Sequence, residues 1–173
     1  LVNGVGRTEG RPIGALYSIP FAGLTEEGLP TFFIDAEHTQ VVGPGNYADI
    51  YFQEYENIDY LKYEGTIDPK ITGSFGNTFS WKGLKLNVFF TYSFGNVLRL
   101  DNLCPVYSSD YSDLTASMKE MKNRWMVPGD ENVTTIPSIP TVRQMREIDA
   151  LNNAYSAYNY STERVAKGDF IRL

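Results

Sequence analysis

Two long runs of alternating apolar and polar residues, joined at Lys82-Gly83, constrain the fold of this chain more than any other feature. In the run from Ile71 to Trp81 the odd positions are mainly apolar, and in the run from Leu84 to Phe94 the even positions are all apolar. Alternation with a period of two is the pattern of a β-strand with two different faces. Because the two-residue connection contains a glycine that tolerates positive φ, the two runs together predict a β-hairpin.

The turn and the hydrophobic pattern predict the same strand register. Counting outward from the turn pairs Trp81 with Leu84 and Phe75 with Phe90, so that apolar residues lie opposite one another on one face. A slip by one residue would place Phe75 opposite polar side chains, and the pattern therefore opposes it. The other face is expected to carry the polar residues Thr72, Ser74, Thr78, Lys85, Asn87 and Thr91.

Both predicted strands are long for a water-soluble domain, in which strands usually have about 5 to 6 residues. At about 3.3 Å per residue, the run from Ile71 to Trp81 spans about 33 Å, and a tilt of about 40° reduces this to a height of about 25 Å. That height matches the apolar band of an outer-membrane barrel, and Trp81, Tyr92 and Phe94 near the two ends suit its aromatic girdles. The pattern alone also fits a long hairpin over the core of a soluble sandwich.

The charge of the chain and its few metal-ligating residues argue against several classes of function. The chain has 173 residues, enough for one domain or one large fragment, and a formal net charge of -6, which disfavours nucleic-acid binding. Its single cysteine, Cys104, and single histidine, His38, exclude an intrachain disulfide and a multi-histidine zinc site. A helical membrane span is not expected, because no apolar run of about 18 residues occurs. A retained signal peptide is not expected either, because the N-terminus lacks a charged region followed by an apolar region and a cleavage site.

The acidic residues give little support for catalysis or for a metal site. Neighbouring carboxylates such as Glu54 and Glu56 are common on solvated loops, and no Gly-x-Ser-x-Gly or Gly-x-Gly-x-x-Gly motif occurs. Calcium could bind loop carboxylates, but their spacing matches no EF-hand. These carboxylates are Asp101, Asp110, Asp113 and Asp130. We therefore expect no enzyme, no catalytic residue, no metal site and no cofactor.

The first 60 residues predict strands and loops. The odd positions from Ile13 to Phe21 are apolar, which predicts a strand. Turn-forming residues at 25–28 predict a short hairpin that returns through 31–35. Residues 43–60 are acidic and rich in tyrosine, and because they show no sustained period they are predicted to be mostly loop.

The last third of the chain predicts loops with short helices, followed by another strand. A helix is predicted over 113–125, with Pro128-Gly129 beyond its end, because apolar residues recur at helical spacing. These residues, expected to form a small local core, are Leu114, Met118, Met121 and Trp125. A weaker helical turn is predicted over 142–151, and residues 164–173 predict the start of a strand with a turn or bulge at Lys167-Gly168.

Four stretches, in order along the chain, carry a family resemblance. They are GRPIGALYSIPFAGL (10–24), LKYEGTIDPKITGSFGNTFSWKGLKLNVFFTYSFGN (61–96), NRWMVPGDE (123–131) and RVAKGDFIRL (164–173). The most specific pieces are the DPK before a Gly/Phe/Asn strand, the aromatic strand that closes on Phe94-Gly95-Asn96, and the GDFIRL ending. Together they resemble the late barrel region of TonB-dependent outer-membrane transporters of the SusC/RagA type, from Bacteroidetes. Residues 47–60 and the surroundings of Cys104 are less typical of that family.

The resemblance implies an all-β fold, in which antiparallel strands belong to a large transmembrane β-barrel of about 22 strands with a plugged lumen. Residues 1–173 would then be a partial barrel, with the long hairpin at 70–97, an outer loop containing a short helix at 98–163 and the next strand beginning at 164–173. It also implies a location in the outer membrane, in contact with outer-membrane lipid. The implied partners are a SusD-like surface lipoprotein and the TonB complex, which would act through parts of the protein outside this chain.

The resemblance implies import of an oligosaccharide or a peptide, and aromatic residues in the outer loops are the candidate substrate contacts. Flat aromatic faces near carboxylates and amides suit both kinds of substrate. The candidates are Tyr47, Tyr51, Tyr55, Tyr107 and Tyr111. The polar face of the hairpin is expected to line the lumen. The alternative function is a soluble all-β glycan-binding module at the cell surface, in which the apolar face of the hairpin would pack on a second sheet of the chain.

Overall fold

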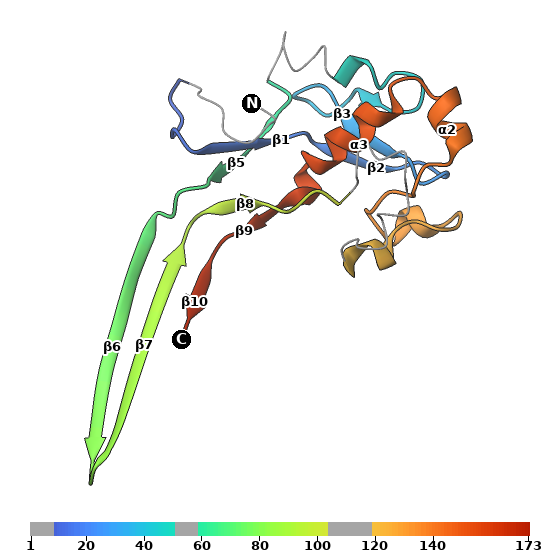
Figure 1. Cartoon of the computed structure of the whole chain (residues 1–173). Helices are drawn as coiled ribbons and strands as arrows, with labels where there is room; N and C mark the ends of the chain where they lie inside the picture. Colours follow the sequence, from blue (N-terminus) through green and yellow to red (C-terminus); the bar gives the residue numbers. More distant parts are fainter. Residues whose placement is uncertain (1–8, 51–58, 104–118) are drawn as a thin grey trace.

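A long β-hairpin projects from a head of shorter strands and helices in the computed structural model (Figure 1). The structure describes residues 9–50, 59–103 and 119–173. The hairpin consists of β6 (Ile71–Trp81) and β7 (Leu84–Phe94), and its turn lies at the end farthest from the head. In the described part of the chain, every pair of neighbouring strands is antiparallel and helices are few.

The register of the hairpin is the one that the sequence predicts. Phe75 pairs with Phe90, Trp81 pairs with Leu84, and the pairing is unbroken between them. Lys82 and Gly83 have φ values of 44° and 88°, so both turn residues are left-handed. A turn with positive φ at both central residues matches the right-handed twist of the two strands it joins. Glycine adopts this conformation without strain, which explains its position in the turn.

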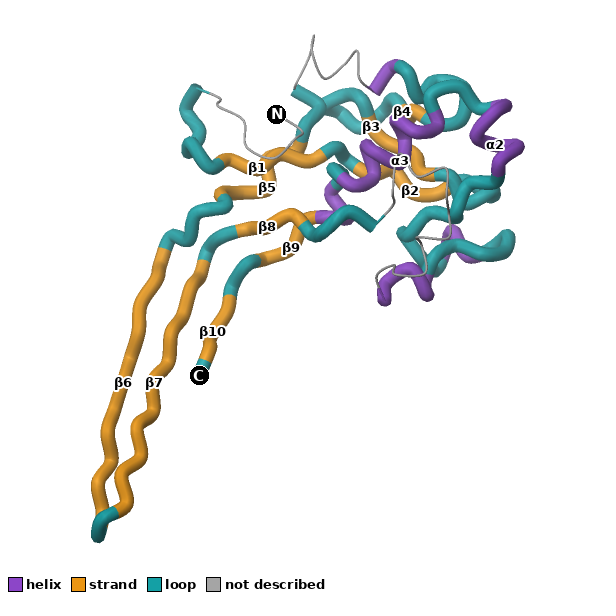
Figure 2. Tube along the Cα trace, in the orientation of Figure 1, coloured by secondary structure: helices purple, strands orange, loops and turns teal. Residues whose placement is uncertain are grey.

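A third strand continues the sheet beside β7. The segment β10 (Phe170–Arg172) pairs with the head-proximal part of β7, and β9 (Val165–Lys167) pairs with β8 (Val97–Arg99) (Figure 2). The predicted strand within 164–173 is therefore confirmed, and so is its predicted interruption, which separates β9 from β10. At this interruption Gly95 N donates to Asp169 Oδ1 at 2.6 Å, which links the two chain segments where both strands break.

The head contains two further small sheets. One pairs β1 (Ala15–Ser18) with β5 (Lys62–Thr66), and the other has the order β2 (Phe21–Leu24), β3 (Pro30–Phe33) and β4 (Val41–Val42). The predicted hairpin with a turn at 25–28 is confirmed by the pairing of β2 with β3. The predicted strand over 13–21 is wrong in its bounds, because β1 ends at Ser18 and β2 begins after Pro20. Proline lacks the N–H that a continuous strand would need there.

One helix dominates the core of the head, and the sequence does not predict it. The helix α3 (Leu151–Asn159) contacts β3, and its Tyr158 ring lies edge-on to Phe21 at 5.6 Å. Its buried face consists of Leu151, Ala154, Tyr155, Ala157, Tyr158 and Asn159. Much of this face is alanine or tyrosine, so its contrast with the outer face is weak. This explains why the helical period is hard to recognise in the sequence.

The other predicted helices are only partly confirmed. The prediction over 113–125 lies outside the described residues up to 118, and its described part is a 3₁₀ helix (Lys119–Asn123) that ends before Trp125. The weaker prediction over 142–151 corresponds to α2 (Val142–Glu147), whose N-cap Thr141 and third residue Gln144 form a reciprocal capping box. Two more 3₁₀ helices are Asp130–Asn132 and Thr162–Arg164.

Replacing Gly83 by Ala should destabilise the hairpin by about 1–2 kcal/mol, because an L side chain is strained at this positive φ. No atom lies within 4 Å of the added Cβ, so the loss would come from the backbone alone. Lys82→Asn should cost little, since asparagine tolerates the left-handed region. The measurement is urea unfolding of the full-length protein, and an equal loss in both variants would contradict the turn geometry.

Candidate functional site

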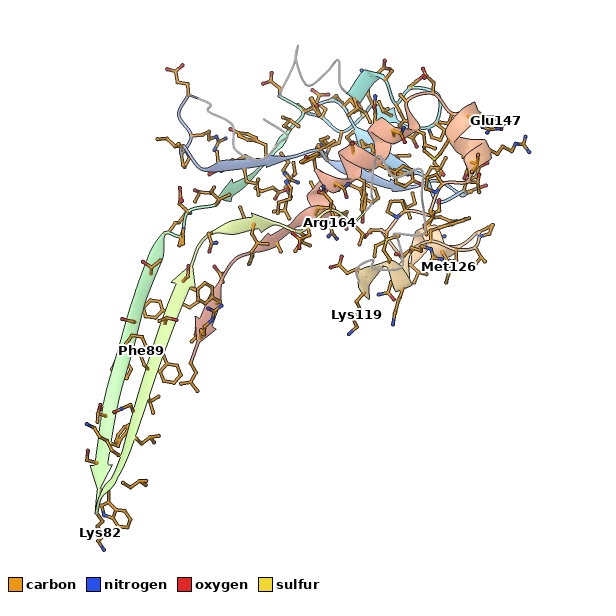
Figure 3. The ribbon with its side chains drawn as sticks, viewed as in Figure 1. Lys82, Phe89, Lys119, Met126, Glu147 and Arg164 are labelled. Atoms are coloured by element: carbon orange, nitrogen blue, oxygen red, sulfur yellow. The ribbon has the colours of Figure 1, made fainter. Side chains whose placement is uncertain are left out.

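The two faces of the hairpin have different chemistry, and the apolar face is exposed. The relative exposures of Phe75, Phe79 and Leu86 are 63%, 56% and 56%. Figure 3 shows the hairpin side chains standing clear of the head along most of its length. Within the described residues, no second sheet covers this face, since β6 and β7 form their sheet only with β10. The face therefore remains open to contact with something outside this part of the chain.

The polar side chains predicted to share one face do so. The pairing register places them at alternate positions of both strands, and Thr78 Oγ1 donates to Asn87 Oδ1 across the hairpin at 2.9 Å. The residues concerned are Thr72, Ser74, Thr78, Lys85, Asn87 and Thr91. One aromatic residue, Phe89, lies on this face with its ring against Gly76, where a Cβ would come within 2.8 Å of it. An aromatic ring over a glycine of the paired strand helps to fix the register.

The strand β10 follows the same division into two faces. Ile171 pairs with Tyr92, which places it on the apolar face, and it is 68% exposed. Phe170 and Arg172 pair with the polar-face residues Ser93 and Thr91. The apolar surface therefore extends over three strands, which indicates that the sheet as a whole has one apolar and one mainly polar side.

Of the five tyrosines predicted to contact a substrate, only Tyr47 lies in the described part of the chain. Tyr47 is fully buried in the core of the head, and its hydroxyl donates to Pro30 O at 2.9 Å. Burial raises the pKa of Tyr47, and its ring has no face open to a ligand, so the expected substrate contact is corrected for this residue. The other four candidates lie outside the described residues: Tyr51, Tyr55, Tyr107 and Tyr111.

Two arginines between the hairpin and the head form contacts that the sequence does not predict. Arg99 Nη2 donates to Tyr17 O at 2.5 Å, and the guanidinium lies 5.3 Å from the centre of the Tyr160 ring. Its burial lowers the pKa of Arg99, while Tyr160 and Glu64 act in the opposite direction. These contacts link β8 to β1 and to the end of α3, which fixes the base of the hairpin against the head.

The second arginine, Arg164, joins three segments of the head. It is 2% exposed, its Nη1 donates to Glu120 Oε2 at 2.6 Å, and its Nη2 donates to Asp101 O at 2.6 Å. Both bonds involve a charged group and are therefore stronger than neutral hydrogen bonds. Because Arg164 directly precedes β9, it anchors the start of that strand.

The loop after the 3₁₀ helix at 119–123 is held by its own carboxylates. Trp125 Nε1 donates to Glu131 Oε2 at 3.0 Å, and Gly129 N donates to the same oxygen at 2.8 Å. The bond from Trp125 is the largest cause that holds the pKa of Glu131 below its usual value. The Trp125 ring also lies against Gly28 in the β2–β3 turn, where no side chain could be accommodated without a shift. Trp125 is therefore a packing residue, but its contact is with the β2–β3 turn, and Leu114 and Met118 of the predicted local core lie outside the described residues.

In residues 9–50, 59–103 and 119–173, no group of three or more His, Cys, Asp or Glu side chains is arranged to hold a metal ion. None of the helices in the described residues has the length and apolar character needed to cross a bilayer.

These features define an antiparallel β chain in which a projecting sheet with one apolar and one polar face adjoins a packed head. No family model matches the sequence, and no curated protein matches it. Among solved structures, the chain is similar to one described as the structure of the RagAB peptide transporter, with a TM-score of 0.53 and 19% sequence identity. The alignment covers 92% of this chain and 15% of that chain. The likeness at this identity concerns the fold, and the chain spans about 15% of the length of the protein it matches.

Arg164→Met should lower the free energy of unfolding by about 2–4 kcal/mol, because it removes two charge-assisted hydrogen bonds at a buried position. Arg143→Met is the matched control, since Arg143 pairs with Glu147 on the solvent side of α2. An exposed pair of this kind contributes about 0–1 kcal/mol. Urea unfolding of the full-length variants measures both changes, and similar losses would contradict the anchoring role of Arg164.

The contact between Trp125 and Glu131 should depend on pH in acid. A carboxyl whose folded pKa is lowered stabilises the fold above its unfolded pKa, about 4.3, and this contribution is lost as the pH falls through the folded value. Trp125 fluorescence should therefore change below about pH 4.3, measured in a Trp81→Phe background so that one tryptophan reports. Glu131→Gln should abolish the transition, and a transition that persists in that variant would refute the assignment.

Proposed function

We propose that this chain forms part of the barrel wall and the outer loops of a TonB-dependent outer-membrane transporter of the SusC/RagA type. In this proposal the apolar side of β6, β7 and β10 contacts lipid, and the polar side faces the lumen. The head forms the substrate-facing outer region. Transport is a property of the whole protein, to which this chain contributes one section.

The observation that carries the proposal is the exposure of most of the apolar face on two strands of 11 residues each. Leaving a Leu or Phe side chain in water forgoes about 1.5–3 kcal/mol of burial free energy. Soluble monomers rarely expose a contiguous apolar surface of this extent. Contact with lipid tails removes the cost, and the estimated height of the strands, about 25 Å, fits the apolar band of an outer-membrane barrel.

The two ends of the hairpin support an orientation in the membrane. The far end is a two-residue turn, and the near end leads into a large head, which is the asymmetry of outer-membrane barrels with short periplasmic turns and long outer loops (Figure 1). At the turn, Lys82 Nζ lies 4.8 Å from the centre of the Trp81 ring. A tryptophan with an adjacent lysine suits the boundary between lipid and water.

The expected partners and substrates follow from the resemblance and from the similar structure. That structure is of a peptide transporter with the name RagAB. We propose that the protein containing this chain imports a peptide or an oligosaccharide, with a SusD-like surface lipoprotein at its outer side and the TonB complex as its energy source. A soluble glycan-binding module would bury the apolar hairpin face on a second sheet, and the exposure of Phe75 and Phe79 does not favour it.

Cysteine accessibility in the full-length protein tests the proposed environment of the hairpin. In a Cys104→Ser background, Thr78→Cys on the polar face should react with a water-soluble, membrane-impermeant maleimide once the outer membrane is opened. Phe79→Cys, one position along the same strand, should be protected from that reagent and should react with a lipid-soluble maleimide. The neighbouring position is the matched control, since both sites have the same height in the sheet.

The outcome depends on the environment of each face. Equal labelling of both positions by the water-soluble reagent would place both faces in water and refute the proposal. Protection of Phe79→Cys in a protein that fractionates with soluble material would instead indicate burial against another protein surface. Either result would be visible by mass shift of the labelled protein.

A further inference from the structure

The strand β6 has one free edge. The sheet of the hairpin has the order β10, β7, β6, so β7 pairs with one side of β6, and no strand of the described residues pairs with the other. Backbone groups of an antiparallel strand point alternately to its two sides. Because the two-residue turn joins Trp81 and Leu84 as a hydrogen-bonded pair, the backbone N–H and C=O groups of the even residues of β6 point to the free edge. These residues are Thr72, Ser74, Gly76, Thr78 and Ser80.

This edge lacks the features that keep a sheet edge unpaired in water. Edge strands of natural proteins are commonly short, or carry charged residues, proline or a bulge. The strand β6 has 11 residues, none of them charged and none of them proline, and its pairing with β7 is unbroken. In the hydrocarbon of a membrane an unpaired row of backbone groups is still less favourable, because no water is present to bind it. The free edge of β6 is therefore suited to pairing with another strand.

The apolar face of β6 contains one amide side chain, that of Asn77. This residue is exposed and lies near the middle of the strand. Its neighbours on the same face are Phe75 and Phe79 along β6, Val88 directly opposite on β7, and Leu86 and Phe90 on the diagonals. None of these side chains has a hydrogen-bonding group. The Asn77 amide therefore finds no partner on the β7 side of its strand.

An amide in contact with lipid tails needs a hydrogen-bond partner, because hydrocarbon offers none. Asparagine side chains in membranes are accordingly found hydrogen-bonded to neighbouring segments. On the apolar face, the neighbours of Asn77 along β6 and across β7 are excluded by their chemistry. The remaining neighbour is the strand that pairs with the free edge.

We propose that a strand of the same polypeptide, outside the described residues, pairs antiparallel with the free edge of β6 and places a hydrogen-bonding side chain beside Asn77. The other side chains of that strand on this face would be apolar, as on β6. This inference rests on the proposed function, since it takes the apolar face to contact lipid. It adds the chemistry of one position on a neighbouring strand.

A second copy of the chain does not fit the free edge. Antiparallel pairing of two copies of β6 would place their heads on opposite sides of the membrane, although the proposed orientation places every head outside. Two copies related by a two-fold axis along the strands would have parallel strands, but that rotation would turn the apolar face of one copy to the polar side of the other. A continuous apolar face therefore requires a different strand.

A photo-crosslinking residue at position 77 of the full-length protein, expressed in its native cells, tests the pairing. We expect a crosslink within one polypeptide, to a peptide outside the described residues. Mass spectrometry of that peptide should show alternating apolar and polar residues, with a Ser, Thr, Asn, Gln, Tyr or His among the apolar ones at the crosslinked position. The same crosslinker at Val88 lies one strand, about 4.8 Å, farther from the free edge and should give this product in about fivefold lower yield.

Replacing Asn77 by Leu tests the hydrogen bond itself. Asn77→Leu should lower the temperature at which the full-length protein, in outer-membrane vesicles, loses its folded form on an electrophoresis gel, because the partner group is left unpaired in lipid. An amide without a partner would give a shift of opposite sign, since leucine is more favourable than asparagine in lipid. Val88→Leu, at the same height on the same face, should leave the temperature unchanged.

Each outcome decides one part of the inference. A crosslink only to another protein molecule, or no protein crosslink at all, would overturn the pairing of the free edge. A raised temperature in Asn77→Leu would overturn the hydrogen bond. If Phe79→Cys is still protected from the water-soluble maleimide, either result leaves the proposed function standing. Labelling of Phe79→Cys by that reagent would instead refute the proposed function.

Discussion

The structure depends on one constraint: once the register of two paired strands is fixed, the face of the sheet on which each side chain lies is fixed as well. Because the turn at Lys82-Gly83 closes in two residues, it sets the register of all the pairs up to Ile71 and Phe94. Once that register is set, apolar residues fill one side and small polar residues fill most of the other. The chemistry of the two sides therefore follows from the turn, and a shift by one residue would exchange them.

The junction between the hairpin and the head converts this regular sheet into an irregular fold. The strands β7 and β8 are separated by Gly95-Asn96, and β9 and β10 are separated at the same level by Gly168-Asp169. Because the strands are interrupted at the same level, the two chain segments change direction together and remain paired on both sides of the interruption. Arg99 and Arg164 then attach the strands beyond the interruption to the head, so that the orientation of the hairpin is coupled to the packing of α3 and β1.

The sequence predicts the hairpin well and the head poorly, for a physical reason. The evidence for the hairpin is local, since a turn and an alternating pattern within 70–97 specify it. The head is held together by contacts between residues that are distant in the sequence. Arg164, for example, binds Glu120, 44 positions away, and no sequence pattern predicts such a pair. Tyr47 shows the same difficulty, because its acidic, tyrosine-rich neighbourhood suggests an exposed loop, whereas its ring fills space beneath Pro30, 17 positions away. Local composition does not reveal which tyrosine completes a core.

The distribution of charge on the hairpin bears on what covers its apolar face. Along β6 and β7 the only charged side chain is Lys85, and it lies on the polar face, so the apolar face carries no charge at all. Lipid tails accept such a surface and would reject one with unpaired cations. The position of Lys85 on the polar face thus leaves the other face of β6 and β7 suited to hydrocarbon.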